Sequence, residues 1–193
     1  MSSFQFARNV LSHQYSHEQI KPQAVSNWQG PFPLPRELVR YYKDFGPLDM
    51  EWRFLPKPFY FPSLKDLWQY QVGFGFDPRL KKLKRGWQPN WIAIADNGEQ
   101  TVIYCMKTGH VLIDFEGEDN WVPVLFFPDL ESMVQVFCLL SDICHRAEID
   151  FKKNIASEAL IPINLREAAF IRLSELTGDL ESAKAILKII GWY

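Results

Sequence analysis

The 193-residue sequence predicts a protein of the α+β class, in which an antiparallel or mixed β-sheet of about four to six strands is flanked by helices. Short runs of β-branched and aromatic residues, separated by turn residues, fill the region from Trp91 to Phe126. Apolar residues at helical spacing precede and follow this region. Apolar residues make up 47% of the chain and aromatic residues 15%, which is typical of a packed globular protein.

Two helices are predicted in the N-terminal part of the chain. Apolar residues recur at helical spacing over residues 4–12, and residues 22–33 then indicate irregular chain. A second helix begins at Pro35, because the missing N–H of proline costs nothing in a first turn, and it ends at Gly46. Its predicted apolar stripe consists of Leu38, Tyr41, Tyr42 and Phe45.

The next part combines a strand with a third helix. Residues 51–55 alternate in polarity and predict a strand. Prolines at positions 56, 58 and 62 confine the following residues to a sheet edge or a loop, since proline cannot donate to a strand ladder. Ser63 and Asp66 form a start similar to a capping box for a helix that ends at Gly73 and Gly75. Residues 77–90 predict a loop.

Four strands follow, over residues 91–95, 100–106, 110–115 and 121–126. The first two flank the turn Asp96-Asn97-Gly98-Glu99, which shares letters with part of a calcium-binding loop. An EF-hand loop needs glycine at its sixth position, whereas Gly98 stands third. Asn-Gly is the preferred pair of a type I′ turn, so we expect a hairpin corner that presents two carboxylates to solvent.

The C-terminal part is predicted to be helical. Asp129 can cap a helix that extends to about residue 149. Asn164 can cap another helix, which ends near Gly178, and a last helix covers residues 179–190. The last two form a helical hairpin.

The length fits one domain with an appendage. We divide the chain into an N-terminal helix and irregular lead-in over residues 1–32, an α+β core over residues 33–150, and a C-terminal helical extension over residues 151–193 that packs on the core. The net charge of −2 gives the whole molecule no field that would draw it to nucleic acid or to an anionic membrane.

Other features indicate where the protein acts. The chain has three cysteines without the spacing of a disulfide framework, which indicates a reducing compartment. Neither a signal peptide nor an apolar run of about 20 residues, the length that spans a bilayer, is visible. We therefore expect a soluble, cytoplasmic protein without a membrane partner.

Short catalytic motifs are absent from the sequence, including the nucleophile elbow, the P-loop and the zinc-protease motif. His13 and His17 have a spacing that can hold a metal on a helix, but a site needs further ligands. Residues 116–120 contain three carboxylates, which could do acid–base chemistry only in a pocket. We predict no catalytic, cofactor-binding or metal-binding residue. A small hydrolase that uses these loop acids or His110 is an alternative.

A basic cluster over residues 79–85 places five positive charges in seven residues. Aromatic residues lie nearby in the sequence, and basic groups interleaved with aromatic rings are typical of platforms for single-stranded nucleic acid. A solvated loop, balanced by acids elsewhere, is the ordinary interpretation. A nucleic-acid-binding adaptor and a contact with an acidic protein both stay open.

Several short segments follow one another in a fixed order between residues 33 and 148. They are LPRELVRYYKDFG at 34–46, YFPSLKDLWQYQVGF at 60–74, WQPNWIAIADNG at 87–98, TGHV at 108–111, FEGEDNW at 115–121 and LESM at 130–133. The series resembles the SUKH superfamily, which includes fungal cell-wall-assembly regulators and many bacterial immunity proteins. The resemblance departs from the family at Glu116, where histidine is common, at Glu118, where glycine is common, and at residues 100–101, where Asp-Pro is frequent. It therefore implies the fold, but no ligand shared on these loops.

The resemblance implies a non-catalytic binding module without a cofactor. Bacterial members commonly bind and neutralise a toxin from their own locus, often a nuclease, which makes a toxin domain the expected partner. A regulatory or scaffold protein of the cell-wall-assembly type is the alternative. An interface needs aromatic or arginine anchors, and an acidic rim would steer a basic toxin toward it. The candidate partner-binding residues are Asp96, Glu99, Glu116, Glu118, Asp119, Trp87 and Trp121.

Overall fold

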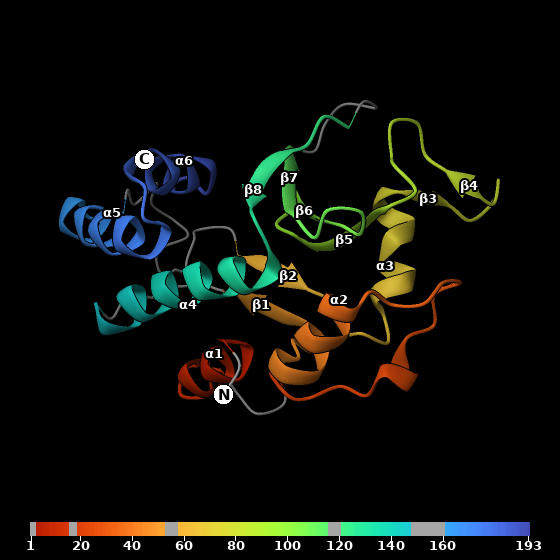
Figure 1. Ribbon diagram of the computed structural model, residues 1–193, viewed down its shortest axis with the longest axis horizontal. Coiled ribbons are helices and arrows are strands. Elements are labelled where there is room, and N and C mark those ends of the chain that lie inside the picture. Colours follow the sequence, from red (N-terminus) through yellow and green to blue (C-terminus); the bar gives the residue numbers. More distant parts are fainter. Residues whose placement is uncertain (1–2, 16–18, 53–57, 116–120, 148–160) are drawn as a thin grey trace.

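The chain forms an antiparallel β-sheet with helices packed against it (Figure 1). A computed structural model describes residues 3–15, 19–52, 58–115, 121–147 and 161–193. Within these residues the strands are β1 (Met50–Trp52), β2 (Phe59–Phe61), β3 (Phe76–Asp77), β4 (Lys82–Leu83), β5 (Trp91–Asp96), β6 (Gln100–Cys105), β7 (Val111–Phe115) and β8 (Val124–Phe127). The helical segments are α1 (Ser3–Leu11), η1 (Val25–Asn27), α2 (Arg36–Arg40), η2 (Tyr41–Phe45), α3 (Leu67–Phe74), α4 (Leu130–Arg146), α5 (Ile163–Thr177) and α6 (Leu180–Ile189).

The large sheet has six described strands in the order β1-β2-β5-β6-β7-β8, and all neighbours are antiparallel. The strands β3 and β4 form a separate small hairpin. Helices α5 and α6 pack against each other as a helical hairpin at the C-terminal end. The predicted α+β class, with an antiparallel sheet and a C-terminal helical hairpin, is confirmed.

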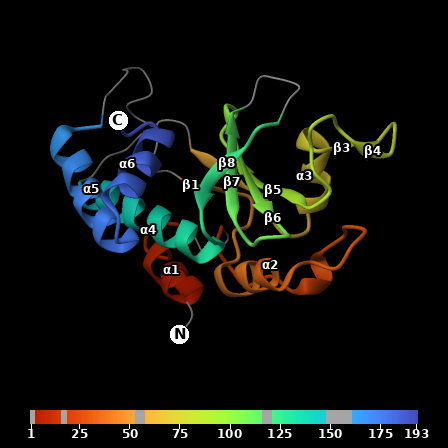
Figure 2. The ribbon, with the colours of Figure 1, turned by 45° about the horizontal axis from the view of Figure 1, so that its top comes forward.

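One face of the sheet shares its hydrophobic core with η2, α4 and α1, and α1 packs against α4 and η2 below the sheet in Figure 2. Trp52 of β1 is central to this core. Its ring stacks on Phe45 with centroids 5.2 Å apart and meets the edge of Phe137 at 5.2 Å. Its indole N–H donates to the Ser141 hydroxyl at 2.7 Å. Residues from the lead-in, the α+β core and the C-terminal extension all belong to this one hydrophobic cluster.

The opposite face carries a second, smaller hydrophobic cluster. Phe74 of α3 and Trp87 cover Ala93 of β5 and Ile103 of β6. Partly buried residues surround them, namely Tyr70, Trp91, Leu112 and Trp121. Strand β6 lies between the two clusters, and all six of its residues are buried.

The predicted cap Asp129 and the predicted stop residues Gly46 and Gly178 are confirmed, and Asp179 caps the last helix. Asp129 caps α4 by accepting the Ser132 N–H at 2.7 Å, and Asp179 caps α6 by accepting the Ser182 N–H at 2.8 Å. Gly46 and Gly178 end their helices with positive φ angles of 71° and 69°. Asn164 is not the cap of α5, because that helix begins one residue earlier, after Pro162.

Three sequence predictions need correction. Strand β2 is not at a sheet edge, because it lies between β1 and β5. Pro58 and Pro62 flank its three residues, so the N–H groups of these residues can still bond in the sheet. Residues 77–90 are not only loop, since they include most of the β3–β4 hairpin. Helix α3 begins at Leu67 and includes Gly73. Of the strand predicted over residues 51–55, residues 53–55 lie outside the described residues.

Two glycines near the end of α3 allow a matched stability experiment. A methyl group at Gly75 would lie 2.2 Å from an atom of the Trp87 ring, whereas one at Gly73 would meet nothing within 4 Å. We predict that Gly75→Ala destabilises the fold by about 1–3 kcal/mol, because the buried indole must shift. Gly73→Ala should stabilise it by about 0.5–1 kcal/mol, because alanine is the better helix former. Urea denaturation measures both, and an equal effect of the two changes would contradict this packing.

Candidate protein-interaction surface

The two predicted tryptophans lie in the second hydrophobic cluster. Trp87 is 6% exposed, and its ring meets those of Trp91 and Trp121 edge to face at 5.7 Å and 4.9 Å. Trp121 is half-buried and also lies 6.5 Å from the Phe74 ring. Trp87 therefore offers little area to a partner, while Trp121 leaves part of its ring accessible. Sequence could not distinguish these positions, because the arrangement depends on which face of the sheet each ring covers.

Asp96 attaches helix α3 to strand β5. A register shift between Ala93 and Ala95 leaves Ile94 as an extra residue, so Ile94 and Ala95 both belong to the main core. The shift turns Asp96 away from that core and toward α3, where its carboxylate accepts the Tyr70 hydroxyl. Burial raises the pKa of Tyr70 above its usual value, and the bond to Asp96 raises it further, so the hydroxyl stays a donor. Asp96 also accepts the Gly98 N–H at 2.9 Å.

Gln71 makes the second attachment between α3 and β5. Its side-chain amide donates to the Ala93 carbonyl at 2.9 Å and accepts the Ala93 N–H at 2.8 Å. Among the described residues, β2 pairs with β5 only at Tyr60 and Asp96, so the Ala93 backbone has no described strand partner on that side. The buried Gln71 amide takes the place of the missing strand residue.

The turn that holds Glu99 is a hairpin corner, but it is not of type I′. Gly98 has a φ of +81°, whereas Asn97 is not among the residues with positive φ. Instead, the Asn97 side-chain carbonyl accepts the N–H groups of Glu99 and Gln100 at 3.1 Å and 2.8 Å. The side chain of Glu99 is exposed at the apex of this corner. Glu116, Glu118 and Asp119 lie outside the described residues.

Four exposed apolar residues lie on β7, on β8 and just before β8. Val124 and Leu125 are consecutive in β8 and so face opposite sides of the sheet. Phe115 pairs with Gln100 in the ladder, which places it next to the corner. Asp114 accepts the N–H groups of Phe115 and Val122, both at 2.8 Å, and so holds the start of the next segment against β7. The exposed fractions are 60% for Phe115, 67% for Val122, 49% for Val124 and 58% for Leu125. We call these four residues, together with Glu99, the sheet-end surface.

The apolar part of this surface was not predicted from the sequence. The run Val122-Pro123-Val124-Leu125-Phe126-Phe127 is apolar throughout, yet β8 is the last described strand of the sheet. Only Phe126 and Phe127 of this run are buried. An unbroken apolar run in a strand that ends a sheet is therefore a signal that some of these residues face solvent.

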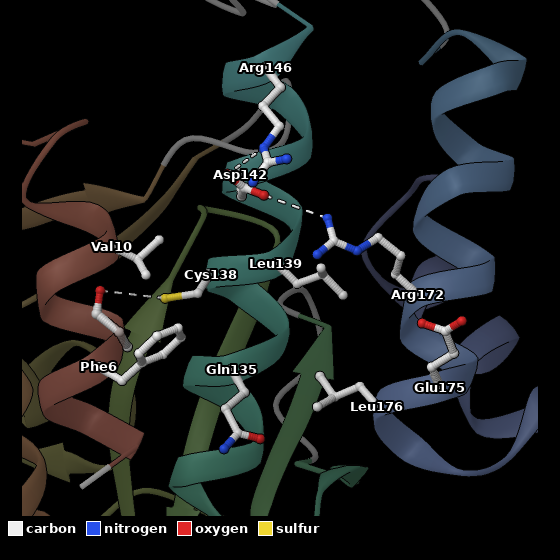
Figure 3. A pocket seen from close by; sticks show the side chains of 11 residues that line it. Phe6, Val10, Gln135, Cys138, Leu139, Asp142, Arg146, Arg172, Glu175 and Leu176 are labelled. Atoms are coloured by element: carbon white, nitrogen blue, oxygen red, sulfur yellow. Dashed lines mark hydrogen bonds and ion pairs between the residues drawn. The ribbon is translucent and has the colours of Figure 1, made fainter. Parts of the chain in front are cut away.

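A separate groove of about 580 Å³ lies between α1, α4 and α5 (Figure 3). Phe6, Leu139 and Leu176 line its apolar part. At one end, Asp142 forms ion pairs with Arg146 at 2.9 Å and with Arg172 at 3.5 Å. The Arg172 pair joins α4 to α5, whereas the Arg146 pair lies within α4, and partly exposed pairs of this kind contribute about 0–1 kcal/mol each.

The groove contains the thiol of Cys138, which has a packing role and not a reactive one. Burial, followed by the charge of Asp142, raises the pKa of Cys138, and its Sγ lies 3.8 Å from the Ala7 carbonyl. Burial likewise raises the pKa of Cys144 to about 12. Both thiols therefore stay protonated at neutral pH, as expected for small apolar residues of a core helix.

No group of three potential metal ligands occurs in the part of the chain that the structure describes. His17, the partner of His13 in the predicted spacing, is not in that part. Among the same residues, none of the helices has the length and apolar character needed to cross a bilayer.

Comparisons of this chain with models of protein families, with curated proteins and with solved structures found no match.

The Gln71 attachment can be tested by substitution. Gln71→Ala leaves the buried N–H and carbonyl of Ala93 without their partner, so we expect a loss of about 2–4 kcal/mol in the free energy of unfolding. Gln69 lies exposed on the same helix, and Gln69→Ala should change stability by less than about 0.5 kcal/mol. Denaturant unfolding of both variants measures these changes in the free energy of unfolding. A Gln71→Ala protein as stable as the parent would show that the side chain is not a structural partner of β5.

Proposed function

We propose that this chain is a non-catalytic protein-binding module that acts as an immunity protein and neutralises a cognate bacterial toxin domain. The observation that carries the proposal is the sheet-end surface, where four large apolar side chains are about half exposed or more and Phe115 lies beside an acidic corner. Phe115 and Val124 lie on the same face of the neighbouring strands β7 and β8, and adjoining exposed apolar groups mark sites of protein association. The ordered resemblance to the SUKH superfamily supports the same class of function.

The chemistry of the sheet-end surface indicates a partner with both apolar and basic groups. Glu99 lies at its rim, and the sequence adds Glu116, Glu118 and Asp119 between Phe115 and Trp121. An acidic rim attracts a positively charged domain, such as one that binds nucleic acid, and raises its association rate. A nuclease toxin fits this description. We propose that binding covers the toxin's nucleic-acid-binding face and so blocks its activity.

The apolar residues and the acids have different energetic roles. Burial of a large apolar side chain contributes about 1.5–3 kcal/mol, so Phe115 and Leu125 can supply much of the affinity. Exposed ion pairs contribute about 0–1 kcal/mol and weaken with salt. Substitutions of the apolar residues should therefore change the dissociation rate, and substitutions of the acids should change the association rate.

The direct test is binding to the product of the neighbouring toxin gene. We predict that the purified chain forms a complex with it at micromolar concentration and that the complex inhibits the toxin. Phe115→Ala combined with Leu125→Ser should weaken binding about 100-fold, measured by titration calorimetry, because two anchors are removed. Both side chains are exposed, so the melting temperature of the free variant should stay close to that of the parent.

A matched control uses an exposed apolar residue elsewhere. Ile171 of α5 is 57% exposed and belongs to the C-terminal hairpin, so Ile171→Ala should leave the affinity unchanged. The immunity proposal fails if no neighbouring gene product binds. The proposed surface is wrong if the complex forms but Ile171→Ala weakens it as much as the double variant does.

A rate measurement tests the role of the acidic corner. Glu99→Lys should slow association about tenfold at low salt and have little effect at high salt, because the steering field is screened there. Stopped-flow kinetics over a range of salt concentrations provides the measurement. An effect that is independent of salt would contradict electrostatic steering.

A further inference from the structure

The β3–β4 hairpin concentrates positive charge at the side of the molecule away from the C-terminal helices (Figure 1). Its five cations are all exposed, namely Arg79, Lys81, Lys82, Lys84 and Arg85. The Lys84 ammonium donates to the Gly73 carbonyl at 2.7 Å and so fastens the hairpin to α3. The other four have no carboxylate partner among the described residues. The hairpin therefore has a strong local charge in a chain whose net charge is −2.

The hairpin's own acid, Asp77, offsets only one of the five positive charges, and it also folds the turn. The Asp77 carboxylate accepts the N–H groups of Arg79 and Leu80 at 2.9 Å and 3.0 Å. The bond from Leu80, reinforced by that from Arg79 and by the nearby cations, lowers the pKa of Asp77. Next in the turn, Lys81 has a φ of +50°, where glycine or asparagine would be less strained.

Apolar side chains are interleaved with the cations. Leu80 at the tip is 60% exposed, and Leu83 on β4 is 38% exposed. At the base of the hairpin, the half-buried ring of Phe76 lies 5.3 Å from that of Trp68. The hairpin thus presents leucines and cations on one small element, which suits a ligand that has both apolar and negatively charged groups.

The aromatic rings nearby do not favour nucleic acid. Trp28 and Phe32 both meet Trp68 edge to face, at interplanar angles of 84° and 88°, and Trp87 is buried. Trp28, Phe32 and Trp68 pack on one another, and Trp87 packs in the second cluster, so they form no row of open, parallel faces on which successive bases could stack. The exposed groups that remain are leucines and cations.

We propose that the β3–β4 hairpin is a second interaction surface, which binds an acidic protein segment that carries apolar side chains. The cations pair with the carboxylates of the segment, and Leu80 and Leu83 contact its apolar groups. This surface is opposite in charge to the sheet-end surface, so it recognises a different feature. The inference does not depend on the proposed immunity function.

The test uses a fluorescent synthetic peptide of glutamates and leucines, with an all-glutamate peptide, an oligothymidine of equal charge and phosphatidylserine vesicles as competing ligands. We expect the glutamate–leucine peptide to bind the full chain at micromolar concentration and low salt, more tightly than the other three. Lys81→Asn with Lys82→Gln should weaken this binding about tenfold. Asparagine tolerates the backbone conformation of position 81, so the variant should keep the melting temperature of the parent.

Two further variants separate specific recognition from general attraction of polyanions. Leu80→Ser should weaken binding of the glutamate–leucine peptide about fivefold but leave the all-glutamate peptide unaffected. Lys184→Gln with Lys188→Gln removes two exposed cations from α6 and should have no effect. The proposal is overturned if the peptide does not bind, if the α6 variant weakens it equally, or if Leu80→Ser has no effect. Tighter binding of the oligothymidine or the vesicles would assign the hairpin to nucleic acid or to a membrane instead.

Discussion

The burial of strand β6 on both faces is the constraint on which the rest of the structure depends. All six of its residues are buried, from Gln100 to Cys105. A strand of this kind needs a complete apolar layer on each side, and the two layers are made differently here. The first consists of long helices from both ends of the chain. The second is small and relies on α3 and a few aromatic rings.

The small layer explains several local features together. Helix α3 lies beside β5 because Tyr70 and Gln71 bind Asp96 and Ala93. The shift at Ile94 makes the first of these bonds possible, since regular alternation would direct Asp96 into the main core. The charged residue that looked most like a ligand site in the sequence thus has a structural role. The sheet-end surface that we propose for a partner lies beyond these contacts.

Sequence patterns predicted the helices from apolar residues at helical spacing, and strands β5 to β8 from short β-branched and aromatic runs separated by turn residues. They missed β3 and β4, which have two residues each and no alternation that could be detected. They also missed the role of Gln71. Its partner is the backbone of Ala93, and the need for this partner arises only from the strand pairing in the folded sheet. The exposure of Phe115 and Leu125 depends on the position of β8 in the strand order, which no local pattern encodes.

Hydrogen exchange at the amide of Ala93 tests the central claim most directly. This N–H is bound by a side chain of α3 and not by a strand, so its protection reports whether α3 is part of the rigid sheet. The account predicts that Ala93 exchanges as slowly as the central amides of β6. Exchange as fast as that of Leu83 in the exposed β3–β4 hairpin would contradict it, because α3 would then be only loosely associated with the sheet.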